Sequence, residues 1–165
     1  MAKSSGGVRN NRGSYDYYKS TSNNIQSVIN DLNNTGHSER KPIVIGLVDK
    51  EMIVYASNNN IDLGSKRIYF TAKQIAHALR ITKKNSGKSI PESALVNFPQ
   101  DRKKMHLYFE MGGVFVYTDM INKFIVHPNY KIKVKKGKTK VVNFLTAGKV
   151  IDPTEFKQSR YKKIR

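Results

Sequence analysis

The chain has 165 residues, with 30 Lys and Arg against 12 Asp and Glu, which gives a formal net charge of +18 at pH 7. The length suits one domain with a tail, and the absence of cysteine excludes disulfides, thiolate zinc sites and a cysteine nucleophile. The sequence has no apolar run near about 18 residues and no signal-peptide pattern. We therefore expect a soluble protein with no membrane partner.

The first 40 residues are rich in Ser, Asn and Gly and offer little apolar surface. This composition predicts that residues 1–40 form a disordered or partly helical leader. Within the leader, four aliphatic residues from Ile25 to Leu32 follow the spacing i, i+3, i+4, i+7. The spacing indicates one or two helical turns that can dock on the rest of the chain or on a partner.

The positive charge belongs to the remainder of the chain, which we expect to be a single domain. Residues 41–165 carry 25 basic and 9 acidic side chains, and hence +16 of the net charge. A field of this size attracts polyanions, chiefly nucleic acid. An anionic membrane surface, or solubility alone, is the alternative that composition leaves open.

The first elements of the domain lie between residues 43 and 84. The apolar runs 43–48 and 52–57 stand on either side of a charged turn and predict a β-hairpin. Residues 67–70 predict a short strand that leads into Thr71, a plausible N-cap for a helix extending to Lys84.

The second half of the domain reads as one more helix followed by strands. The helix starts after Pro91 and is expected to stop at or before Pro99. The predicted extended segments are 105–110, 114–118, 123–126, 130–134 and 141–147. The predicted fold is α+β, with two short helices packed on a twisted antiparallel sheet of about four or more strands and a flexible N-terminal leader.

The predicted helix after Thr71 has a basic face that contains a histidine. At 100° per residue, Lys73, His77, Arg80 and Lys84 fall within about 60° of one another, opposite the aliphatic side chains. Histidine can exchange protons near neutral pH, and Lys or Arg can stabilise a charged phosphorane. The face therefore contains groups suited to phosphodiester cleavage, although a solvated basic face with an incidental histidine fits the same pattern.

A second basic segment spans residues 131–140, where six of ten residues are lysine. Alternation with aliphatic residues places Lys131, Lys133 and Lys135 on one face of a predicted strand. Such a strand can bind the backbone of RNA, or its lysines can protect a sheet edge from aggregation. Both interpretations can hold together.

Two further residues are candidates for the chemistry. His127 precedes a proline near the end of a predicted strand and can be a second proton-transfer group, or a turn histidine bonded to the backbone. Thr146, near the end of the last strand, can donate to a phosphate oxygen or be an ordinary strand residue. The acidic residues are scattered singly, so no metal site is expected, and any phosphodiester chemistry is expected to need no metal or other cofactor.

Aromatic side chains in the predicted strands are candidates for stacking on nucleic-acid bases, although most aromatic residues in alternating strands belong to a core. The candidates are Tyr108, Phe115, Tyr117 and Tyr130.

The segments RIYFTAKQIAHALR, GKSIPESALVNFPQ and KVVNFLTAGKV follow one another with strand pairs between the last two. In this order they resemble the phage-associated nucleases of the barnase/EndoU/colicin/RelE-like superfamily, over about residues 64–152. The resemblance implies a metal-independent ribonuclease that acts on tRNA or mRNA, often as a toxin module linked to a phage or mobile-element protein. His77 and Thr146 match the family's positions, and Arg80 is a third match.

For such an enzyme the expected reaction is attack of the RNA 2′-OH on its own phosphate. His77 would serve as acid or base, Arg80 and Lys73 would contact the phosphate, Thr146 would orient it, and His127 would be the second proton carrier. The implied partners are RNA, such as tRNA, and an immunity or antitoxin protein. The implied location is the host cytoplasm, or a phage particle for a delivered effector, and the oligomeric state stays open.

Two alternatives belong to other classes of protein. One is a non-catalytic, basic nucleic-acid-binding protein of a phage or mobile element, for which the net charge is sufficient. The other is a docking module that retains the fold without chemistry.

Overall fold

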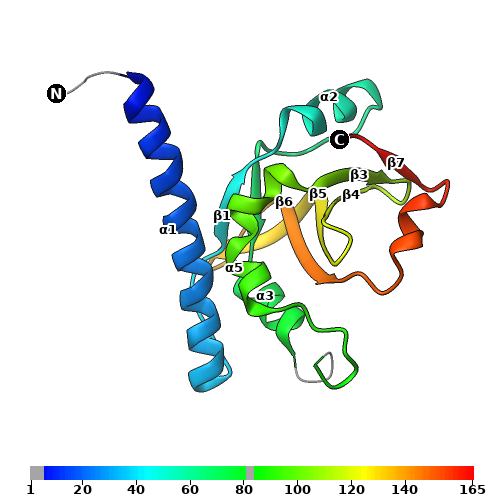
Figure 1. Cartoon of the computed structure of the whole chain (residues 1–165). Helices are drawn as coiled ribbons and strands as arrows, with labels where there is room; N and C mark the ends of the chain where they lie inside the picture. The colour runs from blue at the N-terminus through cyan, green and yellow to red at the C-terminus, as the bar shows by residue number, and fades with distance from the viewer. Residues whose placement is uncertain (1–5, 81–83) are drawn as a thin grey trace.

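In the computed structural model, residues 6–80 and 84–165 are described, with the backbone alone for 6–17 and 134–135. In chain order the elements are α1 (Gly6–Thr35), β1 (Ile43–Leu47), α2 (Lys50–Asn58), β2 (Arg67–Phe70), α3 (Ala72–Leu79), α5 (Glu92–Asp101), the 3₁₀ helix η1 (Arg102–Lys104), β3 (His106–Glu110), β4 (Val114–Thr118), β5 (Asn122–Lys135), β6 (Lys138–Lys149), the 3₁₀ helix η2 (Pro153–Lys157) and β7 (Tyr161–Lys163) (Figure 1).

The strands form a seven-stranded mixed sheet in the order β1-β2-β6-β5-β4-β3-β7. The pair β2–β6 is parallel and the other neighbours are antiparallel. The predicted α+β class is confirmed, and seven strands are compatible with the predicted four or more, but the sheet is mixed and not wholly antiparallel. The parallel pair joins the antiparallel strands β1 and β2, which are connected through α2, to β6, the last strand of the meander β3–β6.

The side chain of Asn143 stabilises the parallel pairing of β2 with β6. Its side chain is fully buried, and its amide nitrogen donates to the carbonyl oxygens of Ser65 at 2.8 Å and Arg67 at 2.9 Å. The two donated hydrogen bonds offset the cost of burying the amide nitrogen, whereas the side-chain oxygen Oδ1 is buried without a hydrogen-bond partner in the described part of the chain. The side chain therefore links β6 to the chain entering β2.

The N-terminal segment is more helical than its composition indicated. Helix α1 has 30 residues, and its first turns project beyond the rest of the molecule (Figure 1). Ile25, Val28 and Ile29 are fully buried in the main core, where α1 packs against α5, α3 and β1. Burial of this aliphatic stripe explains the helix, because tertiary packing outweighs weak helix propensity. No helix in the described ranges is long and apolar enough to cross a bilayer.

The predicted strand over residues 52–57 is wrong, because this segment belongs to helix α2. Met52 and Ala56, four residues apart, are buried, whereas Ile53 and Val54 are 42% and 50% exposed. That pattern has the period of a helix. An apolar run this short does not distinguish a buried strand from a helix by periodicity alone.

Both predicted helix ends also differ from the structure. Helix α3 begins at the predicted cap, where the Thr71 hydroxyl accepts a hydrogen bond from the Gln74 amide at 3.3 Å, but it ends at Leu79. Arg80 is extended, and Lys84 lies beyond the helix. Helix α5 continues through Pro99 to Asp101, because Pro99 and the preceding Phe98 are buried in the core and hold this turn in place.

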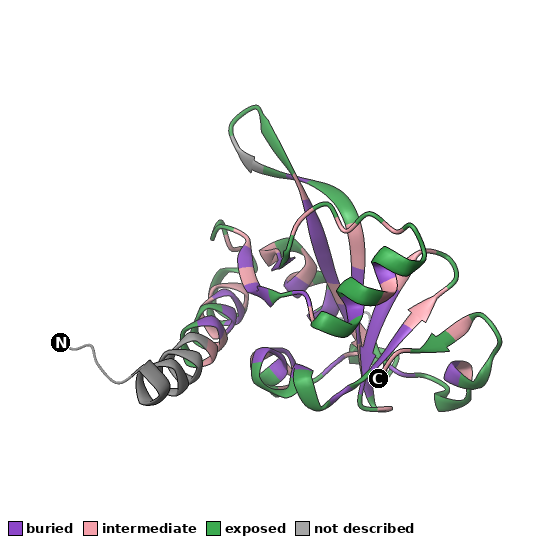
Figure 2. Ribbon diagram, turned by 90° about the horizontal axis from the view of Figure 1, so that it is seen from above, coloured by how far each residue is buried: buried purple, intermediate pink, exposed green. Residues whose placement is uncertain are grey.

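The predicted extended segments 123–126 and 130–134 are parts of one strand, β5. Strands β5 and β6 form a hairpin whose distal part projects away from the body of the molecule (Figure 2). Toward the base of the hairpin, Phe124, Val126, Leu145 and Ala147 face the main core. The lysine-rich residues 136–140 at its far end are exposed.

A buried ionic cluster lies at the other end of the sheet, around Asp49. The carboxylate of Asp49 is 3.2 Å from Arg102 Nη1 and 2.9 Å from Arg165 Nη1. It also accepts a hydrogen bond from the Tyr117 hydroxyl at 3.0 Å. Burial raises the pKa of Tyr117, which stays a neutral donor. The cluster joins the start of α2 to η1, β4 and the last residue of the chain.

Candidate functional site

Helix α3 presents His77 on its exposed side, because Ile75, Ala78 and Leu79 fix the opposite side in the core. The Nδ1 atom of His77 is 3.5 Å from Arg80 Nη1. A guanidinium can only donate hydrogen bonds, so Nδ1 is the acceptor, and the hydrogen of the neutral imidazole is on Nε2. The contact is long, and it favours this tautomer.

A β-bulge in β5 positions the second histidine. His127 is opposite Phe144, and Tyr130 is opposite Val142, so β5 advances three residues where β6 advances two. The extra residue is accommodated near Asn129, which has a φ of 57°. Bulges of this kind change the direction of neighbouring side chains and are common beside active sites.

Gly64 packs directly against this bulge. A Cβ atom on Gly64 would lie 2.9 Å from Val141 Cγ1 and 3.0 Å from Asn129 Oδ1. The φ of Gly64 is also +75°, a conformation that favours glycine. The close approach of the loop before β2 therefore requires a residue without a side chain.

Thr146 lies on the neighbouring strand β6, diagonally opposite His127. Thr146 is paired with Ile125, two residues before the histidine, so both side chains share one face of the hairpin. The Nε2 atom of His127 is 3.1 Å from Thr146 Oγ1. Burial lowers the pKa of His127 below its ordinary value of 6.5, so the ring is neutral at neutral pH and can accept a proton.

These side chains line one cleft of about 440 Å³, which lies between α3, the β5–β6 hairpin and the segments that contain Lys88 and Ile151. Among the described residues that line it there is no Asp or Glu, so the cleft favours an anionic ligand. Lys123 is balanced by Glu155, whose carboxylate is 3.2 Å from its Nζ, whereas Lys88 and Lys149 are exposed. The lining consists of Gln74, His77, Lys88, Lys123, Ile125, His127, Thr146, Ala147, Gly148, Lys149 and Ile151.

The structure thus brings together His77, His127 and Thr146 of the predicted site residues. Arg80 is next to the cleft through its contact with His77. Lys73, Lys131 and Lys133 line a different hollow nearby. Exposed Lys84 is not among the lining residues of the cleft, and the side chain of Lys135 lies outside the described part of the chain.

Three lysines of the cleft were not singled out from the sequence. For Lys123 a signal existed, because residues 123, 125 and 127 alternate along one strand and therefore share a face with His127. Lys149 follows Thr146 in the same closing strand, which was a weaker signal. Lys88 lies in the loop between α3 and α5, and nothing in its local sequence indicated a place in the cleft.

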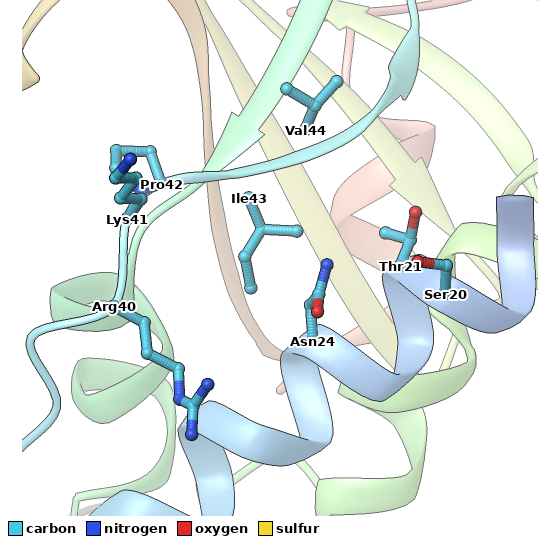
Figure 3. Close-up of a pocket in the computed structure, with 8 residues that line it drawn as sticks. All are labelled: Ser20, Thr21, Asn24, Arg40, Lys41, Pro42, Ile43 and Val44. Atoms are coloured by element: carbon cyan, nitrogen blue, oxygen red, sulfur yellow. The ribbon is translucent and has the colours of Figure 1, made fainter.

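A third hollow, of about 520 Å³, lies between α1 and β1 (Figure 3). Ser20, Thr21 and Asn24 of α1 line it from one side, and the chain from Arg40 to Val44 lines it from the other. The guanidinium of Arg40 is bound to Asp31, with 2.7 Å between Arg40 Nε and Asp31 Oδ2. None of the predicted site residues lines this hollow, so we assign no chemistry to it.

No group of three or more His, Asp or Glu side chains close enough to hold a metal ion occurs among the residues that the structure describes. No protein-family model, no curated protein and no solved structure matches this chain. The cleft and its side chains are therefore the basis for proposing an activity.

Proposed function

We propose that this protein is a metal-independent ribonuclease that cleaves RNA by attack of the 2′-OH on the adjacent phosphate. One observation carries the proposal: His77, His127 and Thr146 come from three separate elements and line a single cleft, with His127 Nε2 only 3.1 Å from Thr146 Oγ1. Two histidines and a hydroxyl beside lysines supply proton transfer and charge stabilisation together.

In this proposal the partly buried His127 is the general base, because its lowered pKa keeps it neutral at neutral pH. It takes the proton of the 2′-OH while the 2′-oxygen forms a bond to phosphorus. The bond from phosphorus to the 5′-oxygen then breaks, and His77 in its protonated form gives a proton to that oxygen. The products are a 2′,3′-cyclic phosphate and a free 5′-OH.

The remaining groups stabilise the charge on phosphorus. Lys88 and Lys149 line the same cleft and can contact the non-bridging oxygens of the phosphorane. The guanidinium of Arg80 lies beside His77 and can hold a phosphate oxygen when His77 is protonated, because Nδ1 then no longer accepts from it. The Thr146 hydroxyl orients His127. DNA lacks the 2′-OH and is not a substrate for this chemistry.

The resemblance to the phage-associated barnase/EndoU/colicin/RelE-like nucleases supports the same activity. We extend the proposal to a toxin or phage effector that acts on cellular RNA such as tRNA and is restrained by an immunity or antitoxin protein.

Incubation with tRNA and with a labelled single-stranded RNA in EDTA tests the proposal. Discrete fragments that end in 2′,3′-cyclic phosphate are expected, with no cleavage of a DNA oligonucleotide of the same sequence. His77→Ala and His127→Ala should each lower the rate by about 10²- to 10⁴-fold. The matched control is His106→Ala, because His106 is an exposed histidine on β3, two strands away from β5. Intact RNA with the wild-type protein, or cleavage at the wild-type rate by both variants, would overturn the proposal.

The projecting hairpin favours a second candidate, a non-catalytic nucleic-acid-binding protein. Exposed lysines along its distal part suit an extended polyanion without any catalytic group. For binding alone, Lys131→Gln and Lys133→Gln should each weaken affinity gradually and reduce the slope of log K against log salt by about 0.7. Lys162→Gln and Lys163→Gln are the matched controls, because both lysines are exposed on the edge strand β7, three strands away from β5. RNA that is bound but not cut would favour this candidate.

A further inference from the structure

A hollow of about 610 Å³ adjoins the cleft along the same hairpin. Gln74 of α3 lines both, so the two are neighbours on the surface. The hollow is lined by the chain before β1, the start of α3 and the middle of the β5–β6 hairpin. The residues that line it are Ser38, Glu39, Arg40, Pro42, Thr71, Ala72, Lys73, Gln74, Tyr130, Lys131, Ile132, Lys133 and Phe144.

Tyr130 forms an aromatic wall of this hollow. Its ring stacks on that of Phe144, with 4.7 Å between centroids and 12° between planes. Phe144 is buried, but Tyr130 is 48% exposed. A ring that is covered on one face and half exposed overall has its other face open to a flat, apolar ligand.

This exposure distinguishes Tyr130 from the other aromatic side chains that were candidates for base stacking. Tyr108, Phe115 and Tyr117 are 7%, 0% and 0% exposed and belong to the cores. Single exposed apolar side chains are common on protein surfaces, but Tyr130 lies in a concave site, stacked on a buried ring and beside lysines, and this position favours a ligand.

Tyr130 lies close enough to His127, a proposed catalytic group, for neighbouring parts of one ligand to contact both side chains. The centroid of the His127 ring is 6.3 Å from that of Tyr130 and 6.3 Å from that of Phe144. The bulge between His127 and Tyr130 separates the two side chains along β5. A nucleotide whose phosphate lies at His127 therefore has its base, or that of a neighbour, within reach of Tyr130.

The charges around the hollow match a sugar-phosphate chain. Lys73, Lys131 and Lys133 are exposed and line it. Arg40 is bound to Asp31, and Glu39, the carboxylate in the lining, has a side chain that is 88% exposed. The hollow thus combines an aromatic face with three lysines, the combination that binds single-stranded nucleic acid.

We propose that this hollow is a nucleobase-binding subsite, in which an unpaired base of RNA stacks on Tyr130 while the lysines hold the flanking phosphates. The inference rests on the ribonuclease function proposed for the cleft and adds its substrate class, single-stranded or looped RNA. A base within a duplex is stacked on its neighbours and paired, so its flat face is not available to Tyr130.

Binding of an RNA that the protein cannot cleave tests the subsite separately from catalysis. The probe is a short fluorescein-labelled 2′-O-methyl oligonucleotide of mixed sequence, which has the bases and phosphates of RNA but lacks the attacking hydroxyl. Fluorescence anisotropy gives its affinity for the wild type and for Tyr130→Leu and Tyr130→Phe. Leucine preserves an apolar contact with Phe144 and removes the aromatic face, whereas phenylalanine keeps the face.

Tyr130→Leu should weaken binding by about 5- to 150-fold, the effect of losing one stacked base, and Tyr130→Phe should bind nearly as the wild type does. The same probe annealed to its complement should bind wild type and Tyr130→Leu equally. Unchanged binding of the single strand to Tyr130→Leu would overturn the subsite, as would an equal loss for the duplex. Thermal unfolding of each variant verifies that the fold is intact.

Cleavage of the unmodified RNA separates the two proposals. If the wild type binds through Tyr130 but does not cut RNA, the ribonuclease proposal fails and the subsite is retained as a binding site. If the wild type cuts RNA and Tyr130→Leu binds the probe normally, the subsite fails and the ribonuclease is retained.

Discussion

Two clusters of charged side chains in this protein have opposite surroundings. Around Asp49, two arginines and a tyrosine hydroxyl converge on one carboxylate that is 8% exposed. In the cleft, the described lining residues carry lysines and histidines without an acid among them, beside open solvent. The carboxylate of the first cluster is paired with both arginines inside the fold, whereas Lys88 and Lys149 of the cleft are exposed. Basic residues are thus paired with an acid where they are buried, and they stay exposed at the cleft, where the proposed RNA would contact them.

The largest effect expected in the cleft is on catalysis and its pH profile. The cleavage rate of the wild type should follow a bell-shaped curve against pH, because one histidine must be neutral and the other protonated. His127→Ala should lower the rate by about 10²- to 10⁴-fold and remove the limb that rises with pH, whereas His77→Ala should remove the limb that falls. Measurement of kcat over a pH series tests the assignment. Loss of the opposite limbs would exchange the two roles.

The largest effect expected in the buried cluster is on stability. Asp49→Ala leaves two arginines without their buried carboxylate and should lower the free energy of unfolding by about 3–5 kcal/mol. Asp101→Ala is the control, since it removes the same charge from an exposed position, and it should change stability by less than about 0.5 kcal/mol. Urea denaturation measures both. Similar losses for the two variants would show that the ionic cluster has no special role.

A smaller effect is expected where the loop before β2 supports the cleft. Gly64→Ala places a side chain against the bulge and adds backbone strain of about 1–3 kcal/mol. Gly36→Ala is the matched control, because Gly36 has a φ of +74° with nothing within 4 Å of the added Cβ. Both variants should lose stability, but only Gly64→Ala should also lose cleavage rate per folded molecule. An equal rate for both would mean that the bulge does not position His127.

Removal of the hydroxyl beside His127 should have a more modest effect. Thr146→Val keeps the β-branched shape and deletes one hydrogen bond, so kcat should fall by about 3- to 10-fold, which corresponds to about 1 kcal/mol. Thr146→Ser should restore most of the activity. A valine variant with wild-type kcat would exclude a positioning role for the hydroxyl.

The smallest expected effect is a pH dependence of the free energy of unfolding that arises from His127 in the cleft. Burial lowers the pKa of His127 in the folded protein, so between that pKa and 6.5 the unfolded chain binds more protons than the folded one. Stability should therefore fall as the pH is lowered through this window and level off below it. Urea denaturation of His127→Gln should show a shallower fall. An identical dependence in wild type and variant would indicate that burial does not bias the protonation of His127.

The α+β class and several local elements were predictable from sequence for physical reasons. Thr71 is a hydroxyl before an amphipathic segment, and it is an N-cap in the structure. The β3–β4 hairpin follows from two apolar runs around two glycines. Segment 52–57 was not predictable, because β-rich residue types overlap with a helical burial pattern. The length of α1 depends on burial of three aliphatic residues against a core that no local pattern reveals.

The candidate site, like the fold, was predictable only in part from the sequence. His77 was identifiable because a helical period places it in a basic stripe, and the alternation of residues 123, 125 and 127 could have linked His127 to Lys123. Their convergence with Thr146 depends on a bulge of one residue and on strand pairing across the chain. Lys73 belongs to the same predicted stripe but faces the Tyr130 hollow, because the stripe spans the boundary between two hollows.

The parallel pairing of β2 with β6 determines when the cleft can exist during folding. Helix α3 follows β2 directly, whereas Thr146 lies in β6, more than 60 residues later in the chain. Contacts between segments so far apart close late, after the local hairpins and helices have formed. A partly synthesised chain that contains α3 but not β6 has His77 without the strand that supplies Thr146 and pairs with β5. The proposed ribonuclease would therefore be inactive during its synthesis until β6 had left the ribosome.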